Sequence, residues 1–127
     1  MKQVLLDTNF IVTCVRQKID FLDQIENLGF QVLVPEQVIK EIEKLSKASG
    51  KSLKLRDQAE LSLRVLKANS KNFKKIKLPA RNVDNGIKKF ADQNPKVILA
   101  TLDRELKRRT SSQKIVIRSK KILEVEP

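Results

Sequence analysis

The 127-residue chain has no histidine, tryptophan or tyrosine, and it contains one cysteine, three glycines and four prolines. The single cysteine, Cys14, excludes a disulfide framework and a cysteine-rich zinc site within the chain. The absence of histidine removes the usual general base, so any catalysis must use carboxylates, a metal ion or lysine. Because only five phenylalanines are present, mostly inside apolar runs, a platform for base stacking is not expected.

The sequence also has no signal-peptide pattern at its start and no apolar run long enough to span a bilayer, which predicts a soluble cytoplasmic protein. Its length and 40% hydrophobic content predict one compact domain over residues 1–127. Positive charge, in contrast, is in excess, because 27 Lys and Arg residues against 15 Asp and Glu residues give a formal net charge of +12. A thermophile-like surface explains many charges but not their one-sided sign. The charge therefore predicts a polyanionic partner, contacted through its sugar–phosphate backbone.

Short apolar runs alternate with helical patterns along the whole chain. Helices are expected in the second half of 11–29 and over 53–68, 83–93 and 104–109, and another over about 35–45. Because the strands are continuous apolar runs, the pattern predicts an α/β fold with a parallel sheet covered on both faces by helices. The expected strands are 2–6, 30–34, 97–100 and 114–118, with a short strand near 73–76 and a last strand or extended tail at 121–126.

Two acidic residues follow predicted strands. Asp7 comes directly after the first strand, and Asp103 follows the run "VILA" within "VILATLDRELKRR". Functional sites of open α/β sheets lie outside the carboxyl ends of the strands, which makes both acids candidates for catalysis. Each can equally be the N-cap of the helix that follows it, because aspartate is favoured there.

Two further acids are placed by helical periodicity. In the helix around residues 35–45, Glu41 and Glu43 border the apolar arc on opposite sides, and periodicity alone does not choose between them. In the helix 83–93, Asp84 lies beside the apolar stripe, whereas Asp92 lies opposite it. An acid in the first helical turn can simply offset the helix dipole. Together, however, four converging carboxylates would repel one another unless a divalent cation neutralised them.

The chemistry of these donors restricts the metal. With only oxygen ligands and no histidine or cysteine among them, Mg²⁺ or Mn²⁺ is expected rather than zinc. Such an ion can lower the pKa of a water and stabilise charge on a phosphodiester during in-line attack.

Four motifs in order, "LLDTNFI", "VIKEIEKL", "VDNGI" and "ATLDRELKRR", resemble those of the PIN-domain nucleases, and above all their ribosomal-RNA-processing branch of the small-subunit processome type and its archaeal relatives. The resemblance covers nearly the whole chain. It implies a PIN-like three-layer α/β/α sandwich with a central parallel sheet. It also implies a metal-dependent endoribonuclease that acts on ribosomal RNA precursors.

Carried over by position, the resemblance assigns the catalytic and metal-binding acids as Asp7, Glu41, Asp84 and Asp103, which chooses Glu41 over Glu43. Relatives often have two adjacent acids where this chain has Asp84 and Asn85, so we expect a second metal ion to be held weakly. Supporting polar positions are Asn9, Asn85 and Thr101. The expected RNA-binding cations flank the acids and lie in the basic segment 71–77: Lys74, Lys75, Lys88, Arg104, Lys107, Arg108 and Arg109.

Two alternative functions remain open at this stage, and a third lacks the residues that it needs. Many small PIN proteins are toxins of toxin–antitoxin pairs, and the fold can also serve a non-catalytic RNA-binding subunit of ribosome assembly. A response-regulator-like signalling domain would need an acid pair after the first strand, which the sequence does not contain. Expected partners are therefore precursor ribosomal RNA, ribosome-assembly proteins and, through the apolar face of the helix 53–68, a second copy of the chain.

Overall fold

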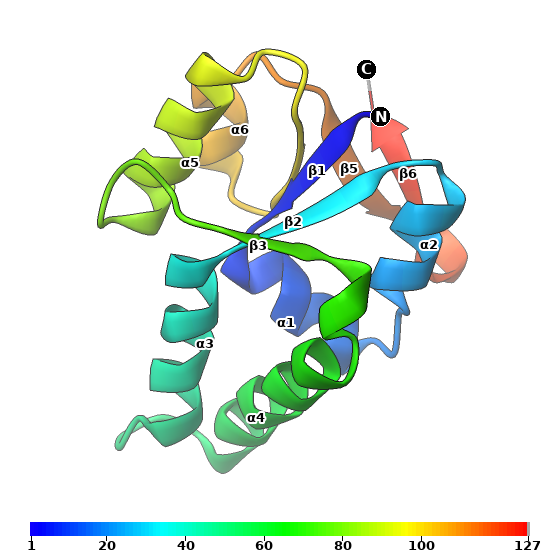
Figure 1. Cartoon of the computed structure of the whole chain (residues 1–127). Helices are drawn as coiled ribbons and strands as arrows, with labels where there is room; N and C mark the ends of the chain where they lie inside the picture. The colour runs from blue at the N-terminus through cyan, green and yellow to red at the C-terminus, as the bar shows by residue number, and fades with distance from the viewer. Residues whose placement is uncertain (127) are drawn as a thin grey trace.

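The computed structural model describes residues 1–126 and contains a six-stranded sheet in the order β3-β2-β1-β4-β5-β6 (Figure 1). The first five strands are parallel to their neighbours, and β6 is antiparallel to β5. The mostly parallel sheet confirms the predicted α/β class. The strands are β1 (Gln3–Leu6), β2 (Gln31–Pro35), β3 (Lys74–Ile76), β4 (Ile98–Ala100), β5 (Lys114–Arg118) and β6 (Ile122–Glu126).

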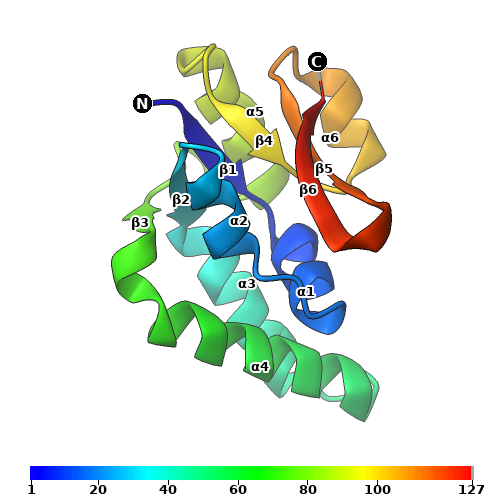
Figure 2. The same cartoon turned by 90° about the vertical axis from the view of Figure 1, so that its right-hand side faces the viewer.

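Helices cover both faces of the sheet. Those named α1, α3 and α4 pack together on one face, while α5 and α6 lie on the other (Figures 1 and 2). The remaining helix, α2, packs against β2 and β6. Their bounds are α1 (Thr8–Arg16), α2 (Phe21–Asn27), α3 (Glu36–Lys47), α4 (Leu53–Ala68), α5 (Val83–Gln93) and α6 (Arg104–Arg109), and two short 3₁₀ turns lie at Ser70–Asn72 and Ser119–Lys121.

The strand order changes direction beside β1. The chain runs outward from β1 to β2 and β3, and then returns through α5 to pair β4 with the other side of β1. Crossovers between parallel strands are right-handed, so this reversal places α5 and α6 on the face opposite to α1–α4. Open α/β sheets bind ligands outside the carboxyl ends of the strands at such a switch point, and we refer to the region outside the carboxyl ends of β1 and β4 as the crevice.

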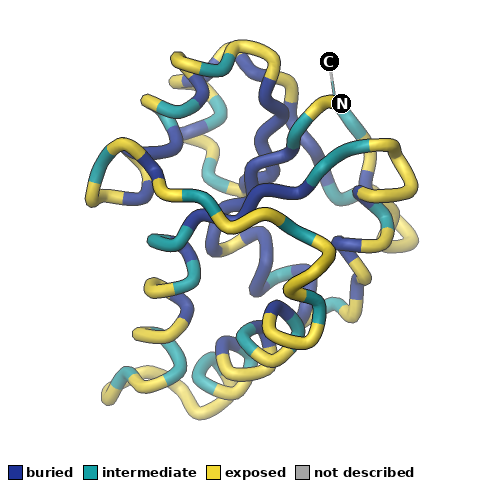
Figure 3. Tube along the Cα trace, in the orientation of Figure 1, coloured by how far each residue is buried: buried dark blue, intermediate teal, exposed yellow. Residues whose placement is uncertain are grey.

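The core consists of the central strands and the inner faces of the helices (Figure 3). In α4, the predicted apolar face is confirmed: Ala59, Ser62 and Leu66 are buried against the neighbouring helices α3 and α1. That face is therefore occupied within the chain, and the apolar side chains that α4 exposes are Leu53 and Leu61. Within residues 1–126, no helix combines the length and apolar character that crossing a bilayer requires.

Two elements differ from the sequence-based expectation. Helix α1 fills the first part of 11–29, where only the second half was expected to be helical. Asn9, Thr13 and Arg16 form a polar stripe at helical spacing, but the segment is rich in β-branched residues, which favour strands over helices. The last strand, β6, pairs antiparallel with β5 through the turn at Ser119–Lys121, so the sheet is not wholly parallel.

Candidate functional site

The crevice beside β1 is built around Asp7, whose exposed fraction is 6%. Its backbone N–H donates to the carbonyl oxygen of Ala100 at 3.0 Å, which continues the β1–β4 pairing into the crevice. Its carboxylate caps α1 by accepting the N–H of Thr8 on Oδ1 at 2.8 Å. The other oxygen, Oδ2, accepts the hydroxyl of Thr101 at 2.8 Å. Asp7 is thus both a helix cap and a fixed carboxylate at the switch point.

The pKa of the Asp7 carboxyl lies above its ordinary value of 3.8, chiefly because burial disfavours the charged form. The hydrogen bonds from Thr101 and Thr8 act in the opposite direction and lower it. The nearby carboxylates of Asp84 and Glu41 raise it further by charge repulsion. Three of the four predicted acids, from β1, α3 and α5, therefore interact electrostatically at this crevice.

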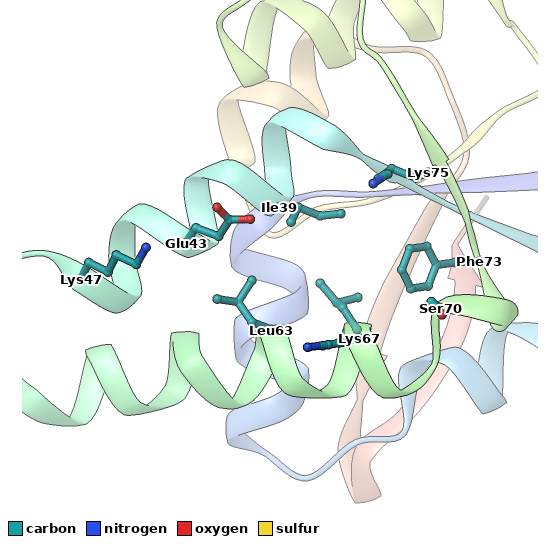
Figure 4. A pocket seen from close by; sticks show the side chains of 9 residues that line it. Ile39, Glu43, Lys47, Leu63, Lys67, Ser70, Phe73 and Lys75 are labelled. Atoms are coloured by element: carbon teal, nitrogen blue, oxygen red, sulfur yellow. The ribbon is translucent and has the colours of Figure 1, made fainter.

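Helix α3 presents Glu41 and Glu43 to different surroundings. Residues two positions apart on a helix point in nearly opposite directions. Glu41 lies close enough to Asp7 to raise its pKa. Glu43 instead lines a cavity of about 520 Å³ between α3 and α4, together with Ile39, Leu63 and other side chains (Figure 4). The structure therefore places Glu41 near Asp7 and Glu43 in another cavity, a difference that helical periodicity alone does not give.

Asp84 is held through the loop that leads into α5. Asn82 caps this helix by accepting the N–H of Asn85 at 3.1 Å. Upstream, the backbone around Leu78 is bound to the side-chain amide of Gln37 on α3. A methyl group at Gly86 would lie 2.8 Å from Cβ of Leu78, so only glycine permits this approach of loop and helix. These contacts tie the helix that carries Asp84 to the helix that carries Glu41.

The fourth acid, Asp103, follows β4 and caps α6. Its Oδ1 accepts the N–H groups of Glu105 and Leu106 at 2.9 and 3.2 Å. Its own N–H donates to Oγ1 of Thr101 at 3.1 Å, so this one hydroxyl links Asp103 to Asp7. Asp103 is half-buried, and Oδ2 takes no part in the hydrogen bonds of residues 1–126. The cap therefore leaves one carboxylate oxygen for a second role.

The donors fit a hard divalent cation. Within the described chain, no three acidic, cysteine or histidine side chains lie close enough to form a ready-made metal cage. Magnesium does not require one, because proteins usually hold it by one or two carboxylates and several waters. Burial and two neighbouring carboxylates disfavour the charge on Asp7, which a bound cation would stabilise. Next to it, Oγ1 of Thr8 is buried without a hydrogen-bond partner in residues 1–126, and so offers a further oxygen.

The supporting positions differ in their burial. Thr101 is buried and bonded to Asp7, whereas Asn9 and Asn85 are exposed on the first turns of α1 and α5. Sequence reasoning missed Gln37, whose side chain holds the loop before Asp84. Its position one helical turn before Glu41, on the same face of α3, is the signal that could have identified it.

Two of the seven predicted RNA-binding cations are engaged in ion pairs. Lys88 contacts Asp92 at 2.7 Å and Arg108 contacts Glu105 at 2.7 Å, both within their own helices. Lys75 lines the cavity between α3 and α4 (Figure 4). The other four are Lys74, Arg104, Lys107 and Arg109, and within residues 1–126 none of these four lies in an ion pair.

A mostly parallel sheet whose strand order reverses beside its first strand, with one aspartate after β1 and another after β4, is the architecture that the resemblance to the PIN-type nucleases predicts. The model of the PIN like domain family matches residues 4–121, and the chain belongs to this family. Its sequence is 32% identical to ribonuclease VapC4 from Methanocaldococcus jannaschii over 98% of this chain and 97% of that protein.

Solved structures share the fold. The PIN domain endonuclease Utp24 superposes with a TM-score of 0.72 at 24% identity, over 98% of this chain and 90% of that one. A domain of a functionally unknown protein from Methanocaldococcus jannaschii superposes with a TM-score of 0.61 at 18% identity, over 100% of both chains. These likenesses confirm the predicted fold, and the family model together with the relative of 32% identity confirms the predicted family.

Proposed function

We propose that the protein is a metal-dependent endoribonuclease that uses Mg²⁺ or Mn²⁺, with Asp7, Glu41, Asp84 and Asp103 as its acids. The observation that carries this proposal is the buried carboxylate of Asp7 at the switch point, close enough to Glu41 and Asp84 for both to raise its pKa. A divalent ion bound there supplies a water of lowered pKa and positive charge for the phosphate.

The residues of the chain have distinct parts in this proposal. Asp7 offers a carboxylate whose orientation is fixed by Thr101 and Thr8. Glu41 on α3 and Asp84 on α5 lie near Asp7 and would help to hold the ion, directly or through water. Asp103 adds Oδ2 from the start of α6 while its other oxygen caps the helix. Outer contacts such as the Thr101 hydroxyl typically tune metal affinity and activity by about 10- to 100-fold.

We infer that the substrate is precursor ribosomal RNA. The net charge of +12 supports a nucleic-acid partner, and the likeness to ribonuclease VapC4 supports RNA as that partner. The four motifs that resemble the ribosomal-RNA-processing branch of the PIN nucleases support precursor ribosomal RNA. The chain offers few aromatic side chains for reading bases, so selection of the cleavage site would depend on RNA structure or on ribosome-assembly proteins.

A second candidate is a toxin ribonuclease of a toxin–antitoxin pair. The likeness to ribonuclease VapC4 over nearly the whole of both chains favours it. The two candidates share the same acids and the same chemistry, and they differ in the RNA that is cut and in the protein partner. Growth arrest on expression, relieved by the product of a neighbouring gene, would favour the toxin.

The test is cleavage of an end-labelled small-subunit ribosomal RNA precursor by the purified protein in Mn²⁺, Mg²⁺ or EDTA. Discrete cuts that require metal and disappear in Asp7→Asn are the expected result. Discrete cuts in another RNA class, with the precursor intact, would support the toxin. Tight binding without cutting under any metal would contradict the proposal and favour a non-catalytic RNA-binding subunit.

A further inference from the structure

A hollow of about 740 Å³ lies between the start of α3 and the loop that precedes α5. The α3 wall consists of Glu36, Gln37 and Lys40, and the loop contributes Lys77, Arg81 and the short apolar segment 78–80. We refer to this hollow as the Lys40–Arg81 groove. Lys77 ends the basic segment 71–77 that the sequence suggests for RNA binding, whereas Lys40 and Arg81 are not among the cations expected from the sequence.

The groove has fixed walls. Nε2 of Gln37 donates to the carbonyl oxygens of Leu78 and Ala80 at 3.1 and 3.2 Å, and the N–H of Leu78 donates back to Oε1 of Gln37 at 3.1 Å. On the other side of the loop, Gly86 allows α5 to approach Leu78 closely. A cleft already held in shape loses little conformational freedom when a ligand binds.

The groove adjoins the two acids that are carried by helices. Lys40 directly precedes Glu41, and Gln37 lies one turn before Glu41 on the same face of α3. On the opposite wall, Arg81 lies three residues before Asp84. A polymer lying in the groove would therefore pass between the helix starts that bring Glu41 and Asp84 to the crevice.

The charge of the groove suits a polyanion. Lys40, Lys77 and Arg81 are exposed, and Glu36 is the one acid on its walls. In the part of the chain that the structure describes, none of the three cations takes part in an ion pair. Cations of this kind gain affinity for phosphates by releasing condensed counterions.

We propose that the Lys40–Arg81 groove holds the backbone phosphates of the RNA strand next to the phosphate that is cut. This inference rests on the proposed ribonuclease function and deepens it. The acids of the crevice repel the neighbouring phosphates, so a substrate needs cations beside them. The groove supplies these cations on the α3–α5 side of the crevice, whereas α6, with Arg104, Lys107 and Arg109, follows β4 on the other side of β1.

The test compares two double variants of the full chain. Lys40→Gln/Lys77→Gln removes two charges from the groove. Lys2→Gln/Lys96→Gln removes two charges from a hollow of about 570 Å³ at the amino ends of β1 and β4, the opposite edge of the sheet. Binding of labelled oligouridylate is measured in EDTA over a salt series, so that cleavage does not interfere.

We expect the groove variant to bind about tenfold more weakly. A plot of the logarithm of its binding constant against the logarithm of the salt concentration should have a slope smaller in magnitude by about 1.4. The control variant should lose less than about twofold. A charge-preserving Lys40→Arg/Lys77→Arg variant should bind like the unmodified protein, which separates lost charge from a folding defect. Equal losses in the two Gln variants would overturn the proposal, because they would show general attraction to a basic surface.

Cleavage distinguishes this proposal from the proposed function. With metal added, the groove variant should raise KM about tenfold and leave kcat nearly unchanged, because Lys40 and Lys77 bind substrate rather than reacting atoms. If the protein binds RNA through the groove but cuts none, the ribonuclease function fails and the groove stands. If it cuts RNA and the two Gln variants behave alike, the groove fails and the function stands.

Discussion

The acids that follow strands and the acids carried on helices are held in very different ways. Asp7 is buried, and both of its carboxylate oxygens accept hydrogen bonds at 2.8 Å. Asp103 is half-buried and uses one oxygen to cap α6. Glu41 and Asp84 are exposed, and the hydrogen bonds of residues 1–126 include neither carboxylate. The crevice thus has a rigid side, built on β1 and β4, and an adjustable side, built on α3 and α5.

Because of this difference, the site can hold one carboxylate in a fixed position while other acids adjust to a bound ion. On the strand side, two hydrogen bonds hold the carboxylate of Asp7 in one orientation. The helix side can adjust its longer or freer side chains to the waters of a bound ion, which magnesium keeps in near-ideal octahedral geometry. Changes on the rigid side that remove a buried charge or a hydrogen bond should therefore alter both activity and stability, while changes to exposed acids on the helix side should alter activity alone.

The largest expected effect is that of Asp7→Asn. This change removes the fixed charge at the centre of the crevice, and we expect kcat/KM for RNA cleavage to fall about 10³-fold. The metal-free variant should nevertheless be more stable than the unmodified protein at neutral pH. The reason is that burial and the repulsion from Glu41 and Asp84 both oppose ionisation of Asp7.

The pH dependence gives the control. The folded-state pKa of Asp7 is raised above 3.8, so the folded protein binds the proton more tightly than the unfolded chain. Its stability contribution is complete below pH 3.8 and is lost as the pH rises through the folded pKa. The difference in thermal unfolding between Asp7→Asn and the unmodified protein should therefore shrink as the pH falls toward 3.8. A variant that is less stable at neutral pH in EDTA would contradict this account.

On the adjustable side, Glu41→Gln should lower kcat/KM about 100-fold, whereas Glu43→Gln should change it less than about twofold. The two changes remove the same charge from positions two residues apart on the same helix, so each serves as the control for the other. Both residues are exposed, and the thermal unfolding temperature should hardly change in either variant. Equal kinetic losses would mean that the electrostatic contact between Glu41 and Asp7 has no part in the reaction.

Two substitutions of Asp103 can distinguish its role as a helix cap from the role of its negative charge. Asparagine caps helices about as well as aspartate, so Asp103→Asn should keep the stability of α6 while lowering activity about 50-fold. Asp103→Ala should lose that activity and also about 1 kcal/mol of stability, because the N–H groups of Glu105 and Leu106 lose their acceptor. If Asp103→Asn cuts RNA at the normal rate, Asp103 is a cap and nothing more.

Much of this fold follows from the sequence because the strands and helices differ sharply in pattern. The helices 53–68 and 83–93 begin and end where their periodicity and caps place them. The antiparallel pairing of β6 was missed although the expected strands 114–118 and 121–126 leave only two residues between them, too few for the crossover that a parallel pair needs. Helix α1 has an amphipathic pattern, but its short length and its many β-branched residues, which favour strands, hid it from sequence reasoning.

The residues of the candidate site differ in how far the sequence alone could identify them. Asp7 and Asp103 were marked by their positions after strands, since parallel strands end at one edge of the sheet. Glu41 needed the family resemblance, and its electrostatic contact with Asp7 exists only once α3 and β1 are packed together. The Lys40–Arg81 groove was invisible to sequence reasoning because it depends on hydrogen bonds between Gln37 and backbone atoms 41 and 43 residues away.

A smaller effect is expected from Thr101→Val, which keeps the shape of the side chain and removes its hydroxyl. Thr101 donates to Asp7 and accepts from the N–H of Asp103, so the variant loses the link between β1 and the start of α6. We expect activity to fall about tenfold. Because this hydrogen bond lowers the pKa of Asp7, the acid limb of the pH–rate profile should also move to higher pH. Thr101→Ser, which keeps the hydroxyl, should restore the original profile.

The smallest kinetic effect, and a clear effect on stability, is expected from Gly86→Ala. The added methyl group would lie 2.8 Å from Cβ and 3.0 Å from Cδ1 of Leu78, so the loop or α5 must shift. Overpacking of this kind costs about 1–3 kcal/mol, which should outweigh the roughly 1 kcal/mol that alanine gains over glycine within a helix.

Chemical unfolding of Gly86→Ala, Leu78→Ala and the double variant measures this contact directly. Leu78→Ala alone should cost about 2–5 kcal/mol because Leu78 is buried in the core. Leu78→Ala removes the contact with Cδ1 but keeps Cβ, so in the double variant the combined loss should be only partly smaller than the sum of the two single losses. Fully additive losses would show that α5 moves away from the loop without resistance. Asp84 would then be held no more firmly than Glu41, and the close approach at Gly86 would not position it.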